Sequence, residues 1–120
     1  MNARPLSVLV VEDEDLVREI VMQELQDAGF RVFEAADGDA AIAILAGQDA
    51  IDLLFTDIRL PGSLDGWGVA EQARRLRENL PVIYASGFST QGLRLVPGSR
   101  FVKKPYAPSA IIDIIRELAA

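Results

Sequence analysis

The chain has 120 residues, 50% of them hydrophobic and 25% charged, with a formal net charge of -6. This length fits one domain, over residues 1–120, with its own core. The absence of Cys and His excludes disulfides, thiol chemistry and histidine ligands within these residues, and the acidic balance argues against direct nucleic-acid binding.

Segments patterned as strands alternate with segments that have the period of helices. In chain order, the pattern predicts a strand at 6–11, a helix from Leu16 to Leu25 with Asp15 as its N-cap, a strand at 31–35, a helix at 40–46, a strand through the apolar run Leu53-Leu54-Phe55, a helix at 67–78, a strand at 81–85, a strand at 100–103 and a helix at 108–118. On the helix at 67–78, the apolar side consists of Val69, Ala70, Ala73 and Leu76.

This alternation favours parallel strands joined by right-handed crossovers, and therefore a doubly wound α/β sheet. Residues 88–99 interrupt it, because they are rich in Ser, Gly and Pro and predict at most one helical turn. No apolar run is long enough to span a bilayer, and no basic segment precedes an apolar one at the start. We therefore expect a cytoplasmic protein without a membrane contact.

Polar side chains stand at the ends of four predicted strands: Glu12 and Asp13, Asp57, Ser86, and Lys104. Each alone is compatible with an ordinary cap or turn. In a parallel sheet, however, the carboxyl ends of the strands share one edge, where ligands bind. Three carboxylates there would form an oxygen site suited to Mg²⁺. An aspartate beside such a site is a candidate nucleophile for phosphoryl transfer, with the hydroxyl and the ammonium contacting the phosphoryl oxygens.

The chain resembles the receiver domain of two-component response regulators from about Leu6 to Leu118. The resemblance rests on five motifs in order: Val8-Leu-Val-Val-Glu12-Asp13-Glu14, Asp57-Ile-Arg-Leu-Pro61-Gly62, Asp65-Gly66, Pro81-Val-Ile-Tyr-Ala-Ser86-Gly87 and Phe101-Val-Lys-Lys104-Pro105-Tyr106. It implies a flavodoxin-like sheet with strand order 2-1-3-4-5. It also implies phosphorylation of Asp57 by a histidine kinase or histidine phosphotransfer protein, with Mg²⁺.

The resemblance implies the same roles for these residues and adds further ones. Glu12, Asp13, Asp57 and the backbone carbonyl of Arg59 would hold the metal. Ser86 and Lys104 would contact the phosphoryl group. Lys104 is preferred over Lys103 because it directly precedes the proline, and the peptide bond between Lys104 and that proline would be cis. Ser86 and Phe101 would form the switch, although Phe101 lacks the hydroxyl of a tyrosine, and core packing is the alternative role of its ring.

The segment between Ser86 and Phe101 is several residues short of a full helix with its loops. We therefore expect a truncated or mobile fourth helix, similar to that of the FATGUY subset of single-domain receivers. The segment Tyr84-Ala-Ser-Gly-Phe88 resembles the fourth-strand motif of that subset. We expect phosphorylation to order residues 88–99. Phe88 is a candidate shield of the phosphate from water, or a plain cover of the sheet edge.

Several alternatives remain open. The chain fits a pseudoreceiver that binds without accepting phosphate, although the intact polar set argues against this. It also fits a receiver segment of a hybrid histidine kinase as well as a stand-alone protein. A phosphatase of the aspartyl-phosphate type would place a second Asp where Arg59 stands, so we do not expect an enzyme. Ile112 on the last helix is a candidate dimer contact, and the downstream protein partner is not identified by the sequence.

Overall fold

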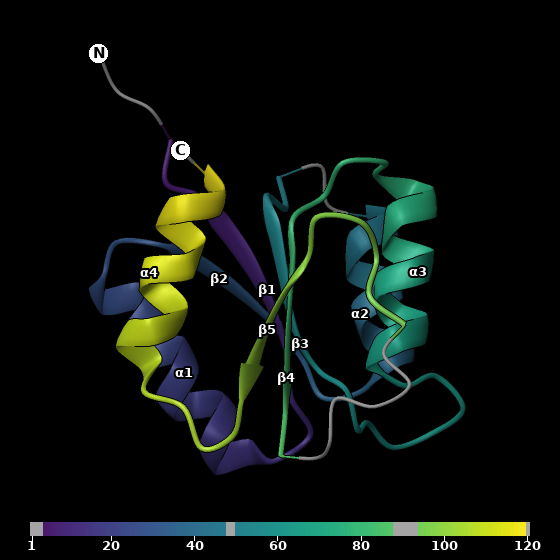
Figure 1. Ribbon diagram of the computed structural model, residues 1–120, viewed down its shortest axis with the longest axis horizontal. Helices are drawn as coiled ribbons and strands as arrows, with labels where there is room; N and C mark the ends of the chain where they lie inside the picture. The colour runs from purple at the N-terminus through teal and green to yellow at the C-terminus, as the bar shows by residue number, and fades with distance from the viewer. Residues whose placement is uncertain (1–3, 48–49, 88–93, 120) are drawn as a thin grey trace.

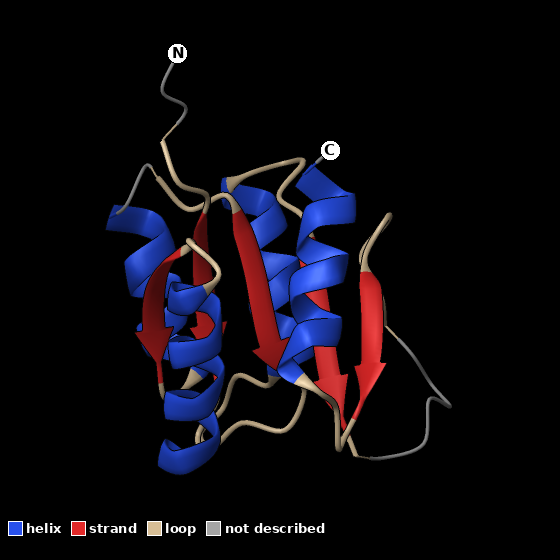
Figure 2. Ribbon diagram, turned by 90° about the vertical axis from the view of Figure 1, so that its left-hand side faces the viewer, coloured by secondary structure: helices blue, strands red, loops and turns tan. Residues whose placement is uncertain are grey.

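A five-stranded parallel sheet forms the centre of the computed structural model, which describes residues 4–47, 50–87 and 94–119 (Figures 1 and 2). The elements are β1 (Ser7–Val11), α1 (Asp15–Asp27), β2 (Arg31–Ala35), α2 (Gly38–Gly47), β3 (Leu53–Asp57), α3 (Gly66–Leu76), β4 (Val82–Ser86), β5 (Arg100–Lys103) and α4 (Pro108–Ala119). The strand order is β2-β1-β3-β4-β5, which confirms the predicted doubly wound, flavodoxin-like fold.

The sheet register explains which strands are most apolar. β1 pairs with both β2 and β3, and β3 pairs in turn with β4. All residues of β1, β3 and β4 are buried, whereas β2 and β5 lie at the edges and are partly exposed. Continuous apolar runs are expected for strands covered on both faces. All strands point the same way, so their carboxyl ends share one edge of the sheet (Figure 2).

Helices cover both faces of the sheet (Figure 1). α1 and α4 pack on one side, where Val21, Leu25, Ile111 and Ile115 join one core cluster. α2 and α3 pack on the other side, against a second cluster that includes Tyr84. Within the described residues, no helix is long and apolar enough to cross a membrane.

The connection between β4 and β5 lacks a helix over residues 94–99. This stretch is bound to α3 and β4 instead. The backbone N–H of Val96 donates to the Tyr84 hydroxyl at 3.1 Å, and Arg74 Nη2 donates to the Pro97 carbonyl at 2.8 Å. The absence of a helix over residues 94–99 agrees with the predicted truncation of the fourth helix. Residues 88–93, including Phe88, lie outside the described residues, so the expected ordering of 88–99 stays a prediction.

Two local predictions are wrong. Glu14, not Asp15, is the N-cap of α1. Asp15 is instead the first helical residue, and its carboxylate pairs with Arg18. Leu76 was expected on the buried side of α3 but is 50% exposed, at the last residue of the helix.

Candidate functional site

Four strand ends place the predicted polar side chains along the carboxyl edge of the sheet. Glu12 directly follows β1, Asp57 ends β3, Ser86 ends β4 and Lys104 directly follows β5. β1, β3 and β4 are buried along their whole length, so their polar side chains become tolerable only where each strand leaves the core. The reversal of strand order between β1 and β3 lies at this edge, which is where ligands bind in such sheets.

Lys104 joins two of these carboxylates. Its Nζ lies 2.9 Å from Glu12 Oε1 and 2.8 Å from Asp57 Oδ2. Burial alone would lower the pKa of Lys104, but the hydrogen bonds and charges of Asp57 and Glu12 outweigh burial and raise it. Lys104 therefore stays protonated at neutral pH and holds a positive charge between the two carboxylates.

Glu12 is the most deeply buried acidic group of the site, with a side chain only 5% exposed. Burial raises the pKa of Glu12 and outweighs the opposing effect of Lys104. One ammonium shared by two carboxylates leaves net negative charge at the edge. A further cation would relieve that charge.

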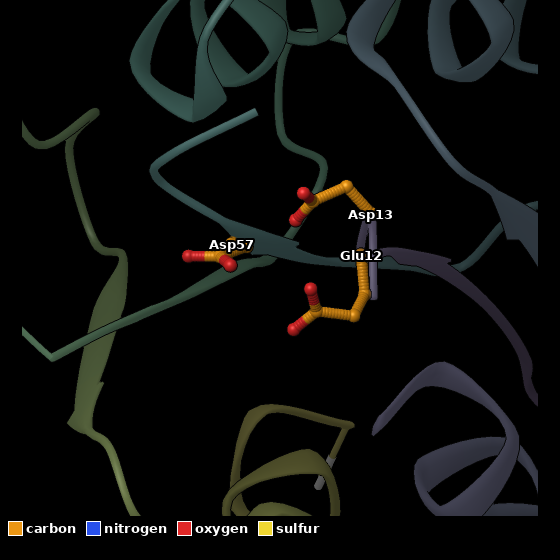
Figure 3. Close-up of side chains that lie close together, drawn as sticks. All are labelled: Glu12, Asp13 and Asp57. Atoms are coloured by element: carbon orange, nitrogen blue, oxygen red, sulfur yellow. The ribbon is translucent and has the colours of Figure 1, made fainter. Parts of the chain in front are cut away.

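Carboxylate oxygens of Glu12, Asp13 and Asp57 gather within 4.8 Å of one another (Figure 3). Glu12 and Asp57 are buried, whereas Asp13 is exposed and stands at the open side. A set of hard oxygen donors with one solvent-facing member matches Mg²⁺, which binds to one or two carboxylates and retains water. The donor chemistry of this cluster therefore fits a divalent cation.

A pocket of about 310 Å³ opens beside these carboxylates. Its lining is made of polar groups from successive strand ends: Asp13, Glu14, Asp57, Arg59, Ser86, Gly87 and Lys104. The predicted acidic, hydroxyl and lysine groups thus converge on one space large enough for a small anion and its solvent. Arg59 lines the same pocket, and its backbone N–H lies 3.4 Å from Asp57 Oδ1.

Phe101 takes a different place. It lies on the edge strand β5, is partly buried and packs against the core on the α2 and α3 side of the sheet. This position agrees with the core-packing alternative and leaves the predicted switch role as a proposal. The peptide bond between Lys104 and Pro105 is cis, as the resemblance implied.

Gly66 allows the start of α3 to lie close to the end of β3, and the sequence reasoning did not predict this role. Its backbone N–H donates to the Ile58 carbonyl at 2.8 Å. A Cβ atom at position 66 would lie 2.6 Å from Ile58 Cα and still closer to the Asp57 carbonyl oxygen. Only glycine lets the start of α3 approach the reactive strand end so closely. Its place in the Asp65-Gly66 motif was the available signal.

Comparison with known proteins agrees with this geometry. The family model of the response regulator receiver domain matches residues 8–116. A response regulator receiver protein from Sinorhizobium medicae WSM419 is 34% identical, with a TM-score of 0.86 over 95% of this chain and 94% of that one. The receiver domain of the sensor histidine kinase PA1611 from Pseudomonas aeruginosa PAO1, whose structure has a magnesium ion in the active-site cleft, is 25% identical, with a TM-score of 0.85 over 97% and 99% of the two chains.

Among curated sequences, an uncharacterized transcriptional regulatory protein of Bacillus subtilis (strain 168), YbdJ, is 28% identical over 92% of this chain. The chain covers 49% of that relative, about half its length. The doubly wound sheet and its acidic edge define a signalling α/β domain of the receiver class. The chain belongs to the response regulator receiver domain family of two-component systems.

Proposed function

We propose that this receiver domain accepts a phosphoryl group on Asp57 from a histidine kinase or a histidine phosphotransfer protein. The observation that carries the proposal is the position of the Asp57 carboxylate, which lies beside an acidic pair and 2.8 Å from the Lys104 ammonium. Catalysis of phosphoryl transfer consists mainly of positioning and charge neutralisation, and this edge offers both.

In the proposed step, a carboxylate oxygen of Asp57 attacks the phosphorus atom of a phosphohistidine. A phosphorus–oxygen bond forms, the phosphorus–nitrogen bond breaks, and the electron pair remains on the imidazole nitrogen of the donor. Lys104 already lies against Asp57 Oδ2, so its charge could neutralise an oxygen of a phosphoryl group bonded to Asp57. The hydroxyl of Ser86, which lines the same pocket, would donate to a second phosphoryl oxygen.

The residues that would hold Mg²⁺ are Glu12, Asp13 and Asp57, together with the Arg59 backbone carbonyl. When bound, this cation supplies charge neutralisation for the entering phosphoryl group. Support comes from the gathered carboxylate oxygens and from the magnesium recorded in the similar receiver of PA1611.

Phosphorylation replaces one carboxylate by a group that carries more negative charge, and this is the signal that a downstream protein would read. We assign the readout to Ser86, Phe101 and residues 88–99, in a cytoplasmic protein without other enzymatic activity. A homodimer through α4 remains part of the proposal, although Ile112 packs partly against the α1 and α4 core. Because PA1611 carries its similar receiver as part of a sensor kinase, a hybrid-kinase origin is the second candidate setting.

Acetyl phosphate with Mg²⁺ tests the proposal without a partner. Intact-mass measurement should show one added phosphoryl group on the unsubstituted chain and none on Asp57→Asn. Asp52→Asn, which alters an aspartate paired with Arg4 away from the site, should still gain the group. A chain that gains no mass under these conditions would be a pseudoreceiver instead.

A further inference from the structure

Arg18 on α1 is a charged side chain that the proposed chemistry does not use, yet it is only 12% exposed. Its three nitrogen atoms each have an acceptor. Nη1 donates to the backbone carbonyl of Glu12 at 2.8 Å, Nη2 donates to Asp15 at 2.8 Å, and Nε donates to Glu34 on β2 at 3.1 Å. A planar fork with several donors is the special property of arginine.

The two ion pairs of Arg18 do not explain its burial. The side chain of Asp15 is 82% exposed and that of Glu34 is 52% exposed, and exposed pairs contribute little. The third contact is different, because its acceptor is the main chain of Glu12, a residue that is only 4% exposed. The guanidinium is thus directed at the backbone that carries the acidic pair.

The short loop between β1 and α1 is held from several sides. The Glu12 N–H donates to the Ala35 carbonyl of β2, and the Glu14 N–H donates to Glu12 Oε2. Arg18 adds two bonds of its own, one from its side chain to the Glu12 carbonyl and one from its backbone N–H to the Glu14 carbonyl. Asp13 lies between these fixed points, and Figure 3 shows its carboxylate beside those of Glu12 and Asp57.

We infer that Arg18 is a positioning residue for the metal site: by fixing the Glu12 carbonyl, it holds Glu12 and Asp13 in the arrangement that binds Mg²⁺. The inference rests on the proposed function. Groups that orient metal ligands typically change metal affinity by about 10- to 100-fold when they are removed. Arg18 acts through the main chain of a ligand and touches no reacting atom.

The sign of the effect separates this role from plain electrostatics. Removal of a nearby positive charge makes the site more negative and, by charge alone, would strengthen Mg²⁺ binding. Loss of positioning would weaken it. A role confined to stability would change the free energy of unfolding and leave the affinity of the folded protein unchanged.

The test is an Mg²⁺ titration followed by amide chemical shifts of Asp13 and Asp57, at a temperature where thermal unfolding shows every variant to be folded. We expect Arg18→Met to bind Mg²⁺ about tenfold more weakly than the unsubstituted chain. Arg18→Lys, which keeps the charge but has one nitrogen in place of three, should also bind more weakly. Arg100→Met removes the same charge from an exposed pair with Glu117 and should keep its affinity.

Equal or tighter binding by Arg18→Met would overturn the inference, as would full affinity in Arg18→Lys. In both cases the unsubstituted chain binds Mg²⁺ and the proposed function stands. If the unsubstituted chain bound no Mg²⁺, the metal part of the proposed function would fail and the inference with it.

Discussion

Gly66→Ala is the substitution that most sharply tests how the fold positions Asp57. The added Cβ would lie 2.6 Å from Ile58 Cα. Carbon atoms in contact need about 3.5 Å, so the start of α3 and the end of β3 must separate by roughly 1 Å. Overpacking usually costs up to about 3 kcal/mol, and we take this upper value because the atoms that the Cβ would meet belong to the backbone. The better helix propensity of Ala returns about 1 kcal/mol, so we expect a net loss of about 2 kcal/mol.

The assay is urea unfolding followed by the fluorescence of Trp67, the single tryptophan. Gly47→Ala is the matched control, because a Cβ there meets no atom within 4 Å, and it should be neutral or slightly stabilising. Gly66→Ala should also accept phosphate from acetyl phosphate more slowly, since the Asp57 carboxylate moves with its strand end. Equal stability and equal phosphorylation rates in the two variants would refute the close-approach argument.

Two further substitutions probe the surroundings of the site. Tyr84→Phe leaves a buried backbone N–H without its acceptor and should lower the free energy of unfolding in urea by about 1–3 kcal/mol. Tyr106→Phe loses the same hydroxyl and should lower it by less. Equal losses in the two variants would contradict this. Lys104→Met leaves Glu12 and Asp57 facing each other and should cost about 2 kcal/mol near neutral pH, less than a fully buried pair because Lys104 is partly exposed. The raised pKa of Lys104 means that its contribution is present below the ordinary lysine pKa and is lost as pH rises through the higher folded value. The cost should shrink at acidic pH, because burial raises the pKa of Glu12 and its protonation removes one of the two charges that face each other. A cost that does not depend on pH would argue against the charge explanation.

Local patterns were enough to predict most of the sheet. The bounds of β2 and β5 were predicted to the residue, because β-branched and aromatic residues there are bracketed by clear turn signals. Buried β1 and β3 were recognisable as apolar runs that end in acidic residues. The order of the strands required the family resemblance, since no local pattern states which strands become neighbours.

Other features depended on contacts between distant segments. The three bonds of Arg18 reach the residue after β1, the start of α1 and β2, so its role appears only once these elements are packed. The need for glycine at position 66 likewise arises from the approach of α3 to the end of β3. The spacing of Leu76 likewise fits the apolar side of α3, but the burial of that position depends on packing at the end of the helix, where Leu76 is 50% exposed.

Localisation of the phosphate shows directly whether Asp57 is the residue that accepts it. After reaction with acetyl phosphate and Mg²⁺, borohydride reduction marks the phosphorylated aspartate, and tandem mass spectrometry of the digest locates it. We expect a mark at Asp57 and at no other acidic residue, and we expect it to be lost when Mg²⁺ is removed by a chelator. A mark on Asp13, or phosphorylation that persists in Asp57→Asn, would contradict this.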